Sequence, residues 1–485
     1  MRRVVDTHVG STSANEKENV MSFRRVYRAV LLAFTCALVS YGVAPAHPIA
    51  RPVVLEGTIV TPDTVIAGGR VVVEKGQITA VGTDVQIPAG SIVVRTNDVI
   101  YPGLIDLHNH VPWNVFPVWT PPQFYDNRYE WRAYQGYLDT YSRWNGALLK
   151  QLCERNEYGE LMALFGGATT IQGALYGNSC VKGPLRSVDF YTGFYGSEVG
   201  HEKFYHVLDV ESITPELAAD VRRKLADKEI TTLVLHLAEG RPGDRESLSE
   251  FTLLESYGLL TERTALIHGS GLDDAALLSM ARKKAKLIWS PRSNLTLYGA
   301  TADIRAALRD KLLVALAPDW SITGSDNLLD ELKVARIFFD DRNDDTWDRQ
   351  LVMMVTSNPA TIAGLGDKIG RIQGGYAADL LVVHGNAARP YGSLVDARVE
   401  DVDLVMIGGQ PYYGAPALMQ ALGQSPDAES MDVCGKRKLL HVHDSGAADE
   451  PPTLSEAKLV KSLTTAMAQV SPEPRPSLAP LFSCH

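Results

Sequence analysis

The segment Val99-Ile100-Tyr101-Pro102-Gly103-Leu104-Ile105-Asp106-Leu107-His108-Asn109-His110 decides the fold of this chain. It is an apolar run that ends in two histidines separated by one residue. Alternate side chains of a strand point to the same face, so His108 and His110 project together from one strand end. Two neighbouring imidazoles placed in this way predict half of a binding site for a divalent metal ion.

Further apolar runs end in polar residues in the same manner. They are residues 231–235 before His236-Leu237-Ala238-Glu239, residues 264–267 before His268, residues 286–291, and residues 313–318 before Asp319. Helix-like stretches at 273–284 and 301–311 lie between them. This alternation is typical of parallel strands that are buried on both faces. We therefore predict an α/β fold, a closed (β/α)8 TIM-like barrel, whose strand ends bring the polar residues to one mouth.

The order HxH, HxxE, single histidine and aspartate at successive strand ends resembles the metal-dependent amidohydrolase superfamily. Within it, the chain is similar to the mononuclear branch that contains adenosine- and cytosine-type deaminases and triazine chlorohydrolases. The resemblance extends from about Val53 to about Gly414 and includes Ser290-Pro291-Arg292-Ser293-Asn294, Asn358-Pro359-Ala360 and residues 374–380. It implies a barrel accompanied by a small β-sandwich that both ends of the catalytic region form.

The resemblance also implies roles for individual residues. A single divalent ion, zinc first with iron or manganese as alternatives, would be held by His108, His110, His236 and Asp319. The segment 204–210, our candidate fourth strand, has no lysine that could be carbamylated to bridge a second ion. Glu239, His268 and Asp319 would be catalytic, and Asn294 and Trp113 would contact the substrate.

These ligands predict hydrolysis through a metal-activated hydroxide, because zinc lowers the pKa of bound water to about 7. Asp319 would accept the proton of that water, His268 would orient the hydroxide or polarise the substrate, and Glu239 would carry a proton to a ring nitrogen or leaving group. A single histidine at a strand end is more often an ordinary hydrogen-bonding residue, and we expect His201, His206 and His384 to be structural. The ordered set of four is what favours a metal site.

The predicted function is hydrolysis of a carbon–nitrogen bond, other than a peptide bond, in a small, aromatic or cyclic molecule. Ring deamination or dechlorination of a heteroaromatic compound is the alternative within the same chemistry. A metal-free scaffold of the same fold, without enzymatic activity, is the alternative from another class. A binuclear phosphotriesterase-like or peptidase-like enzyme is a third, which two bound metal ions would favour.

The chain divides into segments of different character. We expect residues 1–46 to be a signal peptide (its start could be Met21), 47–98 and 366–414 to form the β-sandwich, and 99–365 to form the barrel. Residues 112–150 are an aromatic-rich insertion in the barrel, and 415–485 are a polar, loosely attached tail. Within that tail only residues 454–470 have helical spacing.

The amino-terminal segment has the three parts of a secretory leader. Arg24, Arg25 and Arg28 precede the apolar run 29–39, and Ala44-Pro45-Ala46 offers a cleavage site. We expect a periplasmic or secreted protein that is free of the membrane after cleavage; an uncleaved anchor is the alternative.

Cleavage of the leader changes the net charge. Removing residues 1–46, with six Lys/Arg and three Asp/Glu, leaves 41 Lys/Arg and 54 Asp/Glu, a net charge of −13. Such a charge argues against nucleic acid as a partner, and we expect a small-molecule substrate and a possible homo-oligomer.

Four cysteines remain beyond the leader, and an exported chain can join them in two disulfides. Of the three possible pairings we predict Cys153–Cys180 with Cys434–Cys484, since the second pair would fasten the tail.

The insertion at residues 112–150 is rich in aromatic side chains. Eleven aromatic residues lie between Trp113 and Trp144, and they could line an apolar substrate pocket or pack into a small core of their own, or into a dimer contact.

Overall fold

The structure is a computed structural model, and it describes residues 51–61, 63–173, 184–190, 192–195, 200–339, 345–423, 428–442 and 454–484. The predicted leader and Cys180 lie outside these residues. Among the described helices, none combines the length and the apolar character that crossing a membrane requires.

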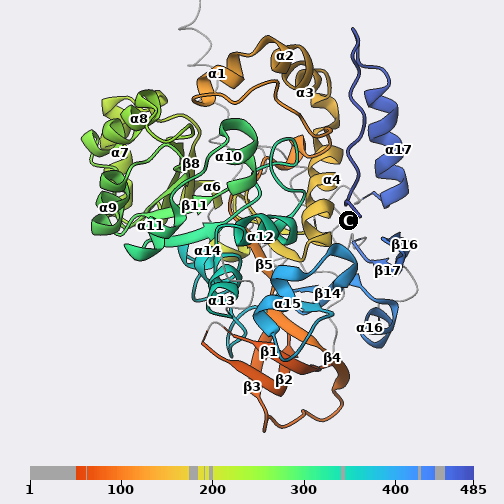
Figure 1. Cartoon of the computed structure of the whole chain (residues 1–485). Helices are drawn as coiled ribbons and strands as arrows, with labels where there is room; N and C mark the ends of the chain where they lie inside the picture. The colour runs from red at the N-terminus through yellow and green to blue at the C-terminus, as the bar shows by residue number, and fades with distance from the viewer. Residues whose placement is uncertain are drawn as a thin grey trace, which may run out of the picture. The chain divides into compact units, whose positions relative to one another are not determined.

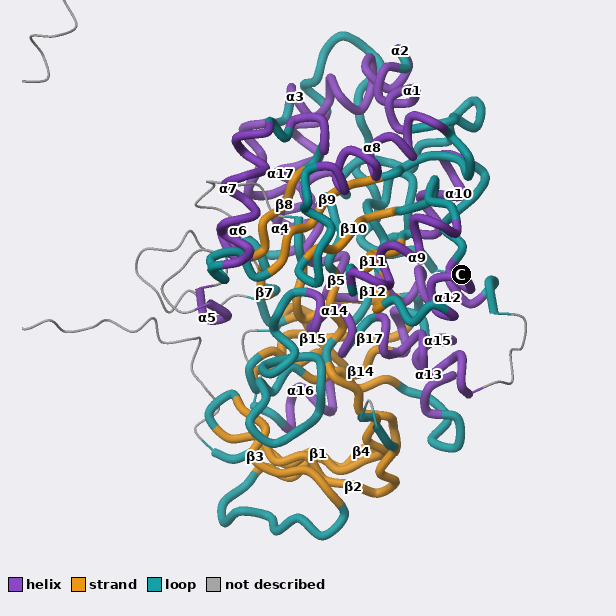
Figure 2. Tube along the Cα trace, turned by 90° about the vertical axis from the view of Figure 1, so that its left-hand side faces the viewer, coloured by secondary structure: helices purple, strands orange, loops and turns teal. Residues whose placement is uncertain are grey.

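Among the described residues, eight parallel strands make up the central part of the fold. They are β5 (Leu104–Asp106), β6 (Ala168–Ile171), β7 (Arg186–Ser187), β8 (Phe204–Val207), β9 (Thr232–Leu237), β10 (Thr264–His268), β11 (Lys286–Trp289) and β12 (Leu313–Leu316). They pair in the order β5-β6-β7 and β8-β9-β10-β11-β12, and Figure 2 follows the second set as neighbouring strands. Their apolar side chains are buried except for Tyr205 and Leu313, which are partly buried, and this agrees with the predicted continuous hydrophobic runs.

A short parallel bridge joins the first of these strands to the last. Asn109, just after β5, pairs with Asp319, just after β12. The backbone N–H of Asp319 donates to the carbonyl of His108, and the N–H of His110 donates to the carbonyl of Asp319, both at 3.0 Å. The predicted barrel fold therefore has its first and eighth strand ends hydrogen-bonded to each other, side by side.

Helices separate the strands, and most of the crossover helices begin at a residue whose side chain caps them. Thr214, Asp244, Asp273 and Asp303 each accept a hydrogen bond from a backbone N–H in the first turn of the helix that follows. The helices after β8 to β12 are α7 (Pro215–Ala226), α8 (Arg245–Ser256), α9 (Asp274–Lys283), α10 (Pro291–Tyr298), α11 (Ile304–Arg309), α12 (Leu328–Arg336), α13 (Asp345–Met354) and α14 (Ser357–Ile362). The predicted helices at 273–284 and 301–311 correspond to α9 and α11.

The two ends of the catalytic region meet in one nine-stranded sheet. Its order is β16 (Glu429–Val433), β17 (Lys436–Leu440), β15 (Gln410–Gly414), β14 (Val402–Ile407), β13 (Leu380–Val383), β4 (Ile92–Pro102), β1 (Val53–Val60), β2 (Val65–Glu74) and β3 (Gln77–Gly82). β4 and β13 pair antiparallel from Val99–Val383 to Pro102–Leu380. The strands β1 to β4 lie together at the bottom of Figure 1. The pairing of the two ends that the resemblance implies is present, in a single sheet.

The boundary predicted at residue 99 is wrong by four residues. Val99 to Pro102 are the last residues of β4 and belong to the nine-stranded sheet, and the barrel begins with β5. Gly103 separates the two strands: its N–H donates to the carbonyl of Asp379, and a Cβ at this position would lie 2.3 Å from the side chain of Thr169. The apolar run from Val99 to Leu107 therefore contributes the end of β4 to the nine-stranded sheet and β5 to the barrel. The hydrophobic pattern alone does not show where one strand ends and the next begins.

The prediction of a loosely attached tail is also wrong. β16 and β17 extend the sheet beyond residue 415, α16 (Pro416–Ala421) packs beside them, and α17 (Glu456–Met467) buries Leu459, Leu463 and Met467. The disulfide Cys434–Cys484 is formed, as predicted; the other predicted pair includes Cys180, outside the described residues. The composition of the segment is polar, but an apolar residue every fourth position is enough to attach a helix.

The remaining helices belong to the insertion and the connections. The insertion contains η1 (Val111–Trp113), α1 (Arg128–Ala133), α2 (Gln135–Tyr137), η2 (Leu138–Ser142), α3 (Arg143–Ala147) and η3 (Leu149–Gln151), and leads into the buried α4 (Leu152–Phe165). The connections contain α5 (Thr192–Tyr195), α6 (Gly200–Lys203), η4 (Val210–Ser212), α15 (Pro390–Asp396) and η5 (Val399–Asp401).

Candidate metal centre

Four side chains from three strand ends converge at one point. His108 and His110 follow β5, His236 lies near the end of β9, and Asp319 follows β12. Nε2 of His108 lies 3.1 Å from Nε2 of His236 and 3.2 Å from Oδ1 of Asp319. Nε2 of His110 lies 3.3 Å from the same Oδ1 atom. The structure thus brings together the four residues that the sequence predicted as ligands.

The separations between these atoms fit a small tetrahedral ion. Ligands at the distances of about 2.0–2.1 Å that zinc takes to nitrogen and oxygen stand about 3.3 Å apart. Oδ1 of Asp319 is buried and accepts no hydrogen bond from any described residue. An isolated buried carboxylate oxygen is costly unless a positive charge compensates it. The donor set and this unsatisfied oxygen therefore fit one divalent metal ion.

The histidine rings are held in the form that binds metal. Burial lowers the pKa of His108 and of His236 well below the usual value, and it lowers the pKa of His110 to about 3. A neutral imidazole keeps a lone pair for coordination. Burial raises the pKa of Asp319, and the hydrogen bond from Ser293 opposes that effect. A bound cation would favour the ionised carboxylate further, which the neutral histidine rings cannot do.

The outer nitrogens of two ligands have partners that orient the rings. Nδ1 of His108 lies 2.8 Å from Oγ of Ser290, and Nδ1 of His236 lies 3.0 Å from Nε2 of His206. Such contacts fix which nitrogen faces a metal. The sequence predicts only a structural role for His206, whereas in the structure it contacts a candidate ligand. Its place on β8, the fourth strand of the barrel, was the one sequence feature that could have associated it with the site.

The second oxygen of Asp319 is held by a serine that the sequence analysis did not assign. Oγ of Ser293 donates to Oδ2 of Asp319 at 2.6 Å and lies 2.9 Å from Oγ1 of Thr323. Ser293 is inside the segment 290–294 that carried part of the resemblance. Its hydrogen bond leaves Oδ1 as the oxygen that faces the histidines.

Glu239 and His268, the predicted acid–base residues, lie beside the four ligands. Oε2 of Glu239 is 3.6 Å from Nε2 of His268, and both side chains are buried. Tyr298 donates a hydrogen bond of 2.6 Å to Oε1 of Glu239, and Trp131 donates one of 2.8 Å to the tyrosine oxygen. The tyrosine, at the end of α10, is a further residue that the sequence analysis missed.

Asn294 and Trp113, the predicted substrate contacts, occupy different positions. Oδ1 of Asn294 lies 2.9 Å from Nδ1 of His268, and its Nδ2 donates to Thr301. Trp113 is half-buried, with its ring 5.6 Å from that of Trp320. Their roles toward a substrate stay predictions, whereas Asn294 orients the ring of His268 directly.

The backbone is strained at three of these strand ends. Ala238, His268 and Asp319 have φ values of 51°, 69° and 72°, in the left-handed region that residues other than glycine avoid. Such strain costs about 1–3 kcal/mol per residue and gathers at functional sites. The neighbouring contacts must therefore hold these residues in place.

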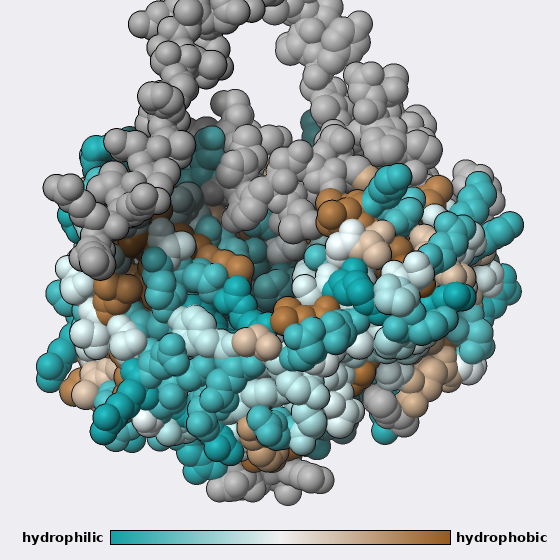
Figure 3. Space-filling model, turned by 90° about the horizontal axis from the view of Figure 1, so that it is seen from above, coloured by the Kyte–Doolittle hydropathy of each residue, from teal (hydrophilic) through white to brown (hydrophobic). Residues whose placement is uncertain are grey.

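The aromatic insertion packs largely on itself. Trp119, Trp131, Tyr137, Tyr141 and Trp144 are buried, with centroid separations of 5.0–6.4 Å along the cluster. These rings form the small core that was one of the predicted alternatives. Trp320 contacts both Trp131 and His110, and so connects that core to the site. The helices α1 to α3 lie at the top of Figure 1, and the visible described surface on that side is mainly hydrophilic with small separate apolar patches (Figure 3).

Comparisons with known proteins agree with this architecture. The chain is 24% identical over 383 residues to a 5-methylthioadenosine/S-adenosylhomocysteine deaminase from Thermococcus onnurineus, covering 70% of this chain and 88% of that protein. An adenosine deaminase from Xanthomonas campestris with bound zinc superposes with a TM-score of 0.59 at 19% identity, covering 74% and 92%. The atrazine chlorohydrolase from Arthrobacter aurescens, in complex with zinc, gives a TM-score of 0.58 at 18% identity, covering 74% and 95%.

The match to a protein family covers the region that supplies most of the site. Residues 213–411 fit the model of the Amidohydrolase family. This range contains His236, Glu239, His268 and Asp319, while His108 and His110 precede it. The solved structures that superpose on the chain share its fold. Residues 213–411 of the chain are therefore similar to the amidohydrolase family.

Proposed function

We propose that this protein is a metal-dependent hydrolase that acts on a carbon–nitrogen bond, other than a peptide bond, of a small heterocyclic molecule. One observation carries the proposal: Oδ1 of Asp319 faces Nε2 of His108 and of His110 without a hydrogen bond from the described residues. Beside it, Glu239 and His268 supply groups for proton transfer. The deaminases among the relatives support the same reaction class.

The bound ion would supply a water molecule whose pKa is lowered to about 7. Asp319 is placed to take the proton of the attacking water, because Ser293 holds its other oxygen. Tyr298 occupies Oε1 of Glu239, so Oε2 is the oxygen left to deliver a proton to the substrate. His268, fixed by Asn294, would hold the attacking oxygen or polarise the substrate. Proton transfer by a positioned carboxylate contributes about 10²–10⁴-fold.

Deamination of an adenosine-like compound is the first candidate reaction, since relatives of this kind are named deaminases. The chlorohydrolase of the same fold supports the alternative, displacement of chloride from a heteroaromatic ring. The test is to incubate zinc-loaded protein with adenosine, 5-methylthioadenosine, S-adenosylhomocysteine and atrazine. Ammonia release supports deamination, and chloride release supports the alternative. Release of neither, from protein that contains one metal ion, would contradict both.

We propose zinc as the resident ion, held by one site per chain. The proposal rests on the three-imidazole, one-carboxylate set and on the zinc in two solved structures of the same fold. Elemental analysis of protein purified without added metal should give close to one equivalent of zinc. Predominant iron or manganese would contradict the choice of ion, and two tightly held equivalents would contradict the single site.

We also propose that the chain is exported and acts outside the cytoplasm. The basis is the basic, apolar and small-residue pattern of residues 24–46, supported by the disulfide Cys434–Cys484. Expression of the full chain in a Gram-negative host and sequencing of the mature amino terminus should give a start near His47. An intact leader on soluble cytoplasmic protein would contradict the proposal.

A further inference from the structure

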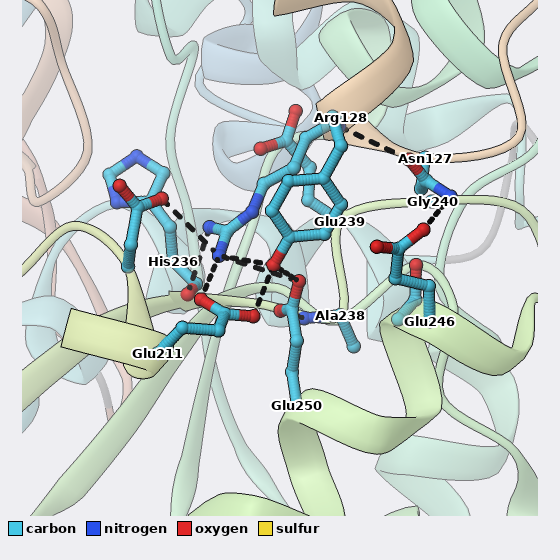
Figure 4. A network of polar contacts seen from close by, with 12 residues as sticks. Asn127, Arg128, Glu211, His236, Ala238, Glu239, Gly240, Glu246 and Glu250 are labelled. Carbon is cyan, nitrogen blue, oxygen red and sulfur yellow. Dashed lines mark hydrogen bonds and ion pairs between the residues drawn. The ribbon is translucent and has the colours of Figure 1, made fainter. Parts of the chain in front are cut away.

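A buried arginine of the insertion contacts the end of β9, the strand that carries His236, and the segment after it that carries Glu239. The side chain of Arg128, the first residue of α1, is 1% exposed. Figure 4 shows it reaching from α1 toward the end of β9 and toward Glu250 on α8. The sequence gives no reason to single out this arginine among those of the insertion, so its position is a finding of the structure.

Arg128 binds the main chain of the segment from both its backbone and its side chain. Its backbone N–H donates to the carbonyl of Glu239 at 3.0 Å. Its Nη1 donates to the carbonyl of His236 at 3.3 Å and to that of Leu208 at 3.1 Å. One residue therefore fixes the carbonyls of a metal ligand and of the proposed proton carrier, three positions apart.

Glu250 completes the arrangement from the other side. Its Oε2 accepts a hydrogen bond of 2.7 Å from the N–H of Ala238, between the two residues that Arg128 holds. Its Oε1 lies 3.4 Å from Nη2 of Arg128 and accepts a hydrogen bond from Tyr129. Ala238 has a φ of 51°, so this hydrogen bond stabilises a strained residue. Glu250 is itself 1% exposed.

The guanidinium also contacts the loop that follows β8. Its Nη2 lies 3.4 Å from Oδ1 of Asp209 and 3.4 Å from Oε2 of Glu211. These carboxylates are 30% and 46% exposed, so water weakens their attraction to the arginine. The contacts to the buried main chain and to Glu250 are therefore the stronger part of the network.

We infer that Arg128 and Glu250 act as a clamp that positions His236 and Glu239 for metal binding and proton transfer. This Arg128–Glu250 clamp rests on the proposed function, and it deepens that function by adding two positioning residues outside the set of ligands. It works on the backbone of residues 236–239, so the insertion must be docked for the site to have its final geometry. Neither residue is placed to touch the substrate or the metal.

The test compares substitutions that remove or keep the hydrogen bonds. Arg128→Met keeps much of the length but removes every donor, whereas Arg128→Lys keeps a positive charge and one group of donors. Glu250→Ala removes the acceptor of Ala238, whereas Glu250→Gln keeps a carbonyl oxygen for it. Arg132→Met is the matched control: Arg132 lies one turn later on α1 and pairs with Asp209, and among the described residues no hydrogen bond or ion pair joins its side chain to residues 236–239.

Two measurements are made on folded, zinc-loaded protein. The first follows the release of zinc to an excess of chelator, without any substrate present. The second determines kcat and KM for the compound that the substrate panel identifies. Removing an outer partner of a metal ligand costs about 10–100-fold in metal affinity or activity. We expect Arg128→Met and Glu250→Ala to release zinc faster and to lose kcat in about this range, with little change in KM.

The conservative variants distinguish positioning from a merely structural role. Arg128→Lys should recover part of the kcat that Arg128→Met loses, Glu250→Gln should be better than Glu250→Ala, and Arg132→Met should release zinc at the wild-type rate. The inference is overturned if Arg128→Met keeps both wild-type zinc release and wild-type kcat. It is also overturned if the losses of zinc retention and of kcat are proportional to the fraction of unfolded protein, and Arg128→Lys and Glu250→Gln recover neither. Should the wild type turn over no compound, the proposed function fails, and zinc release alone decides the clamp.

Discussion

Oδ1 of Asp319 lies 3.2 Å from Nε2 of His108, a contact between the two strand ends that the bridge at Asn109 joins. The oxygen has no hydrogen bond from the described residues, and burial keeps the imidazole neutral. An acceptor and a neutral ring in this position attract each other weakly. A shared cation is what makes the geometry favourable.

The first prediction concerns removal of that cation. Dialysis against a chelator should abolish turnover, and one equivalent of zinc should restore it. The thermal unfolding midpoint should fall after removal, because an ion that binds only the folded chain stabilises it. Activity and unfolding are measured on the same samples, with chelator saturated by zinc as the control. Full activity in metal-free protein would contradict the site.

The second prediction separates proton transfer from metal binding. Glu239→Gln should retain zinc and lose about 10²–10⁴-fold in kcat, because the amide cannot carry the proton. His268→Asn should behave similarly. Asp319→Ala removes a ligand, so zinc content and turnover should fall together. Metal analysis beside steady-state kinetics checks all three. Wild-type activity of Glu239→Gln, or retained zinc and turnover in Asp319→Ala, would show that the roles are wrongly assigned.

The third prediction concerns Tyr298. Its hydroxyl occupies Oε1 of Glu239. Tyr298→Phe should retain zinc but lower kcat by about tenfold, the value of a net hydrogen bond of roughly 1.5 kcal/mol to a charged group. Tyr376→Phe is the control, because that hydroxyl donates to the carbonyl of Gly366 away from the site. Equal kinetics of the two variants would mean that Tyr298 does not orient the glutamate.

The fourth prediction concerns pH. Burial raises the pKa of Glu160 from its usual 4.5 to about 8. Between these values the unfolded chain has lost a proton that the folded chain keeps, so this residue makes stability fall as pH rises. In Glu160→Gln the fall in unfolding midpoint from pH 5 to pH 8 should become smaller. The new glutamine brings a side-chain N–H donor to this buried position. The side-chain amide of Asn156, which now donates to Glu160, can rotate so that its Oδ1 accepts from that donor; this Oδ1 has no hydrogen bond from a described residue.

Thermal scans at both pH values measure that effect. The exposed Glu262→Gln serves as the control and should leave the slope unchanged. The assignment fails if Glu160→Gln keeps the wild-type difference between pH 5 and pH 8.

The fifth prediction concerns the disulfide Cys434–Cys484, whose cysteines are 50 positions apart. Closing a loop of this length stabilises a chain by about 2–4 kcal/mol. Cys434→Ser should lower the free energy of unfolding by about this amount, measured by denaturant titration. Cys484→Ser should give the same loss, since it removes the same bond. Unchanged stability in both variants would show that the bond does not fasten the carboxyl-terminal segment.

The sequence revealed the features that depend on strand periodicity. His108, His236 and Asp319 each follow an apolar run, and the order of these runs predicted both the barrel and the convergence of the ligands. The orienting partners were out of reach, because Ser293 and Tyr298 act through contacts made by the turn and helix after β11. Nothing in local spacing specifies which carboxylate a serine or tyrosine will meet.

The prediction of a loosely attached carboxyl-terminal tail rested on the average composition of the segment, which hides the apolar positions that attach it. Residues 415–485 are polar on the whole, but Leu459, Leu463 and Met467 form one buried stripe on α17. The backbone of Ala479 then donates to the carbonyl of Val115, just beyond η1. A few well-spaced side chains and main-chain hydrogen bonds outweighed the average, because docking depends on a continuous face of the helix.

The bridge between Asn109 and Asp319 has a consequence for the order in which the protein acquires its ion. These residues are about 210 positions apart, and bringing such distant segments together costs entropy that only the intervening contacts can repay. During synthesis, the two histidines after β5 emerge long before the aspartate does. A growing chain therefore carries an incomplete ligand set until its eighth barrel strand has been made. Tight retention of the ion then reports that nearly the whole barrel has been assembled.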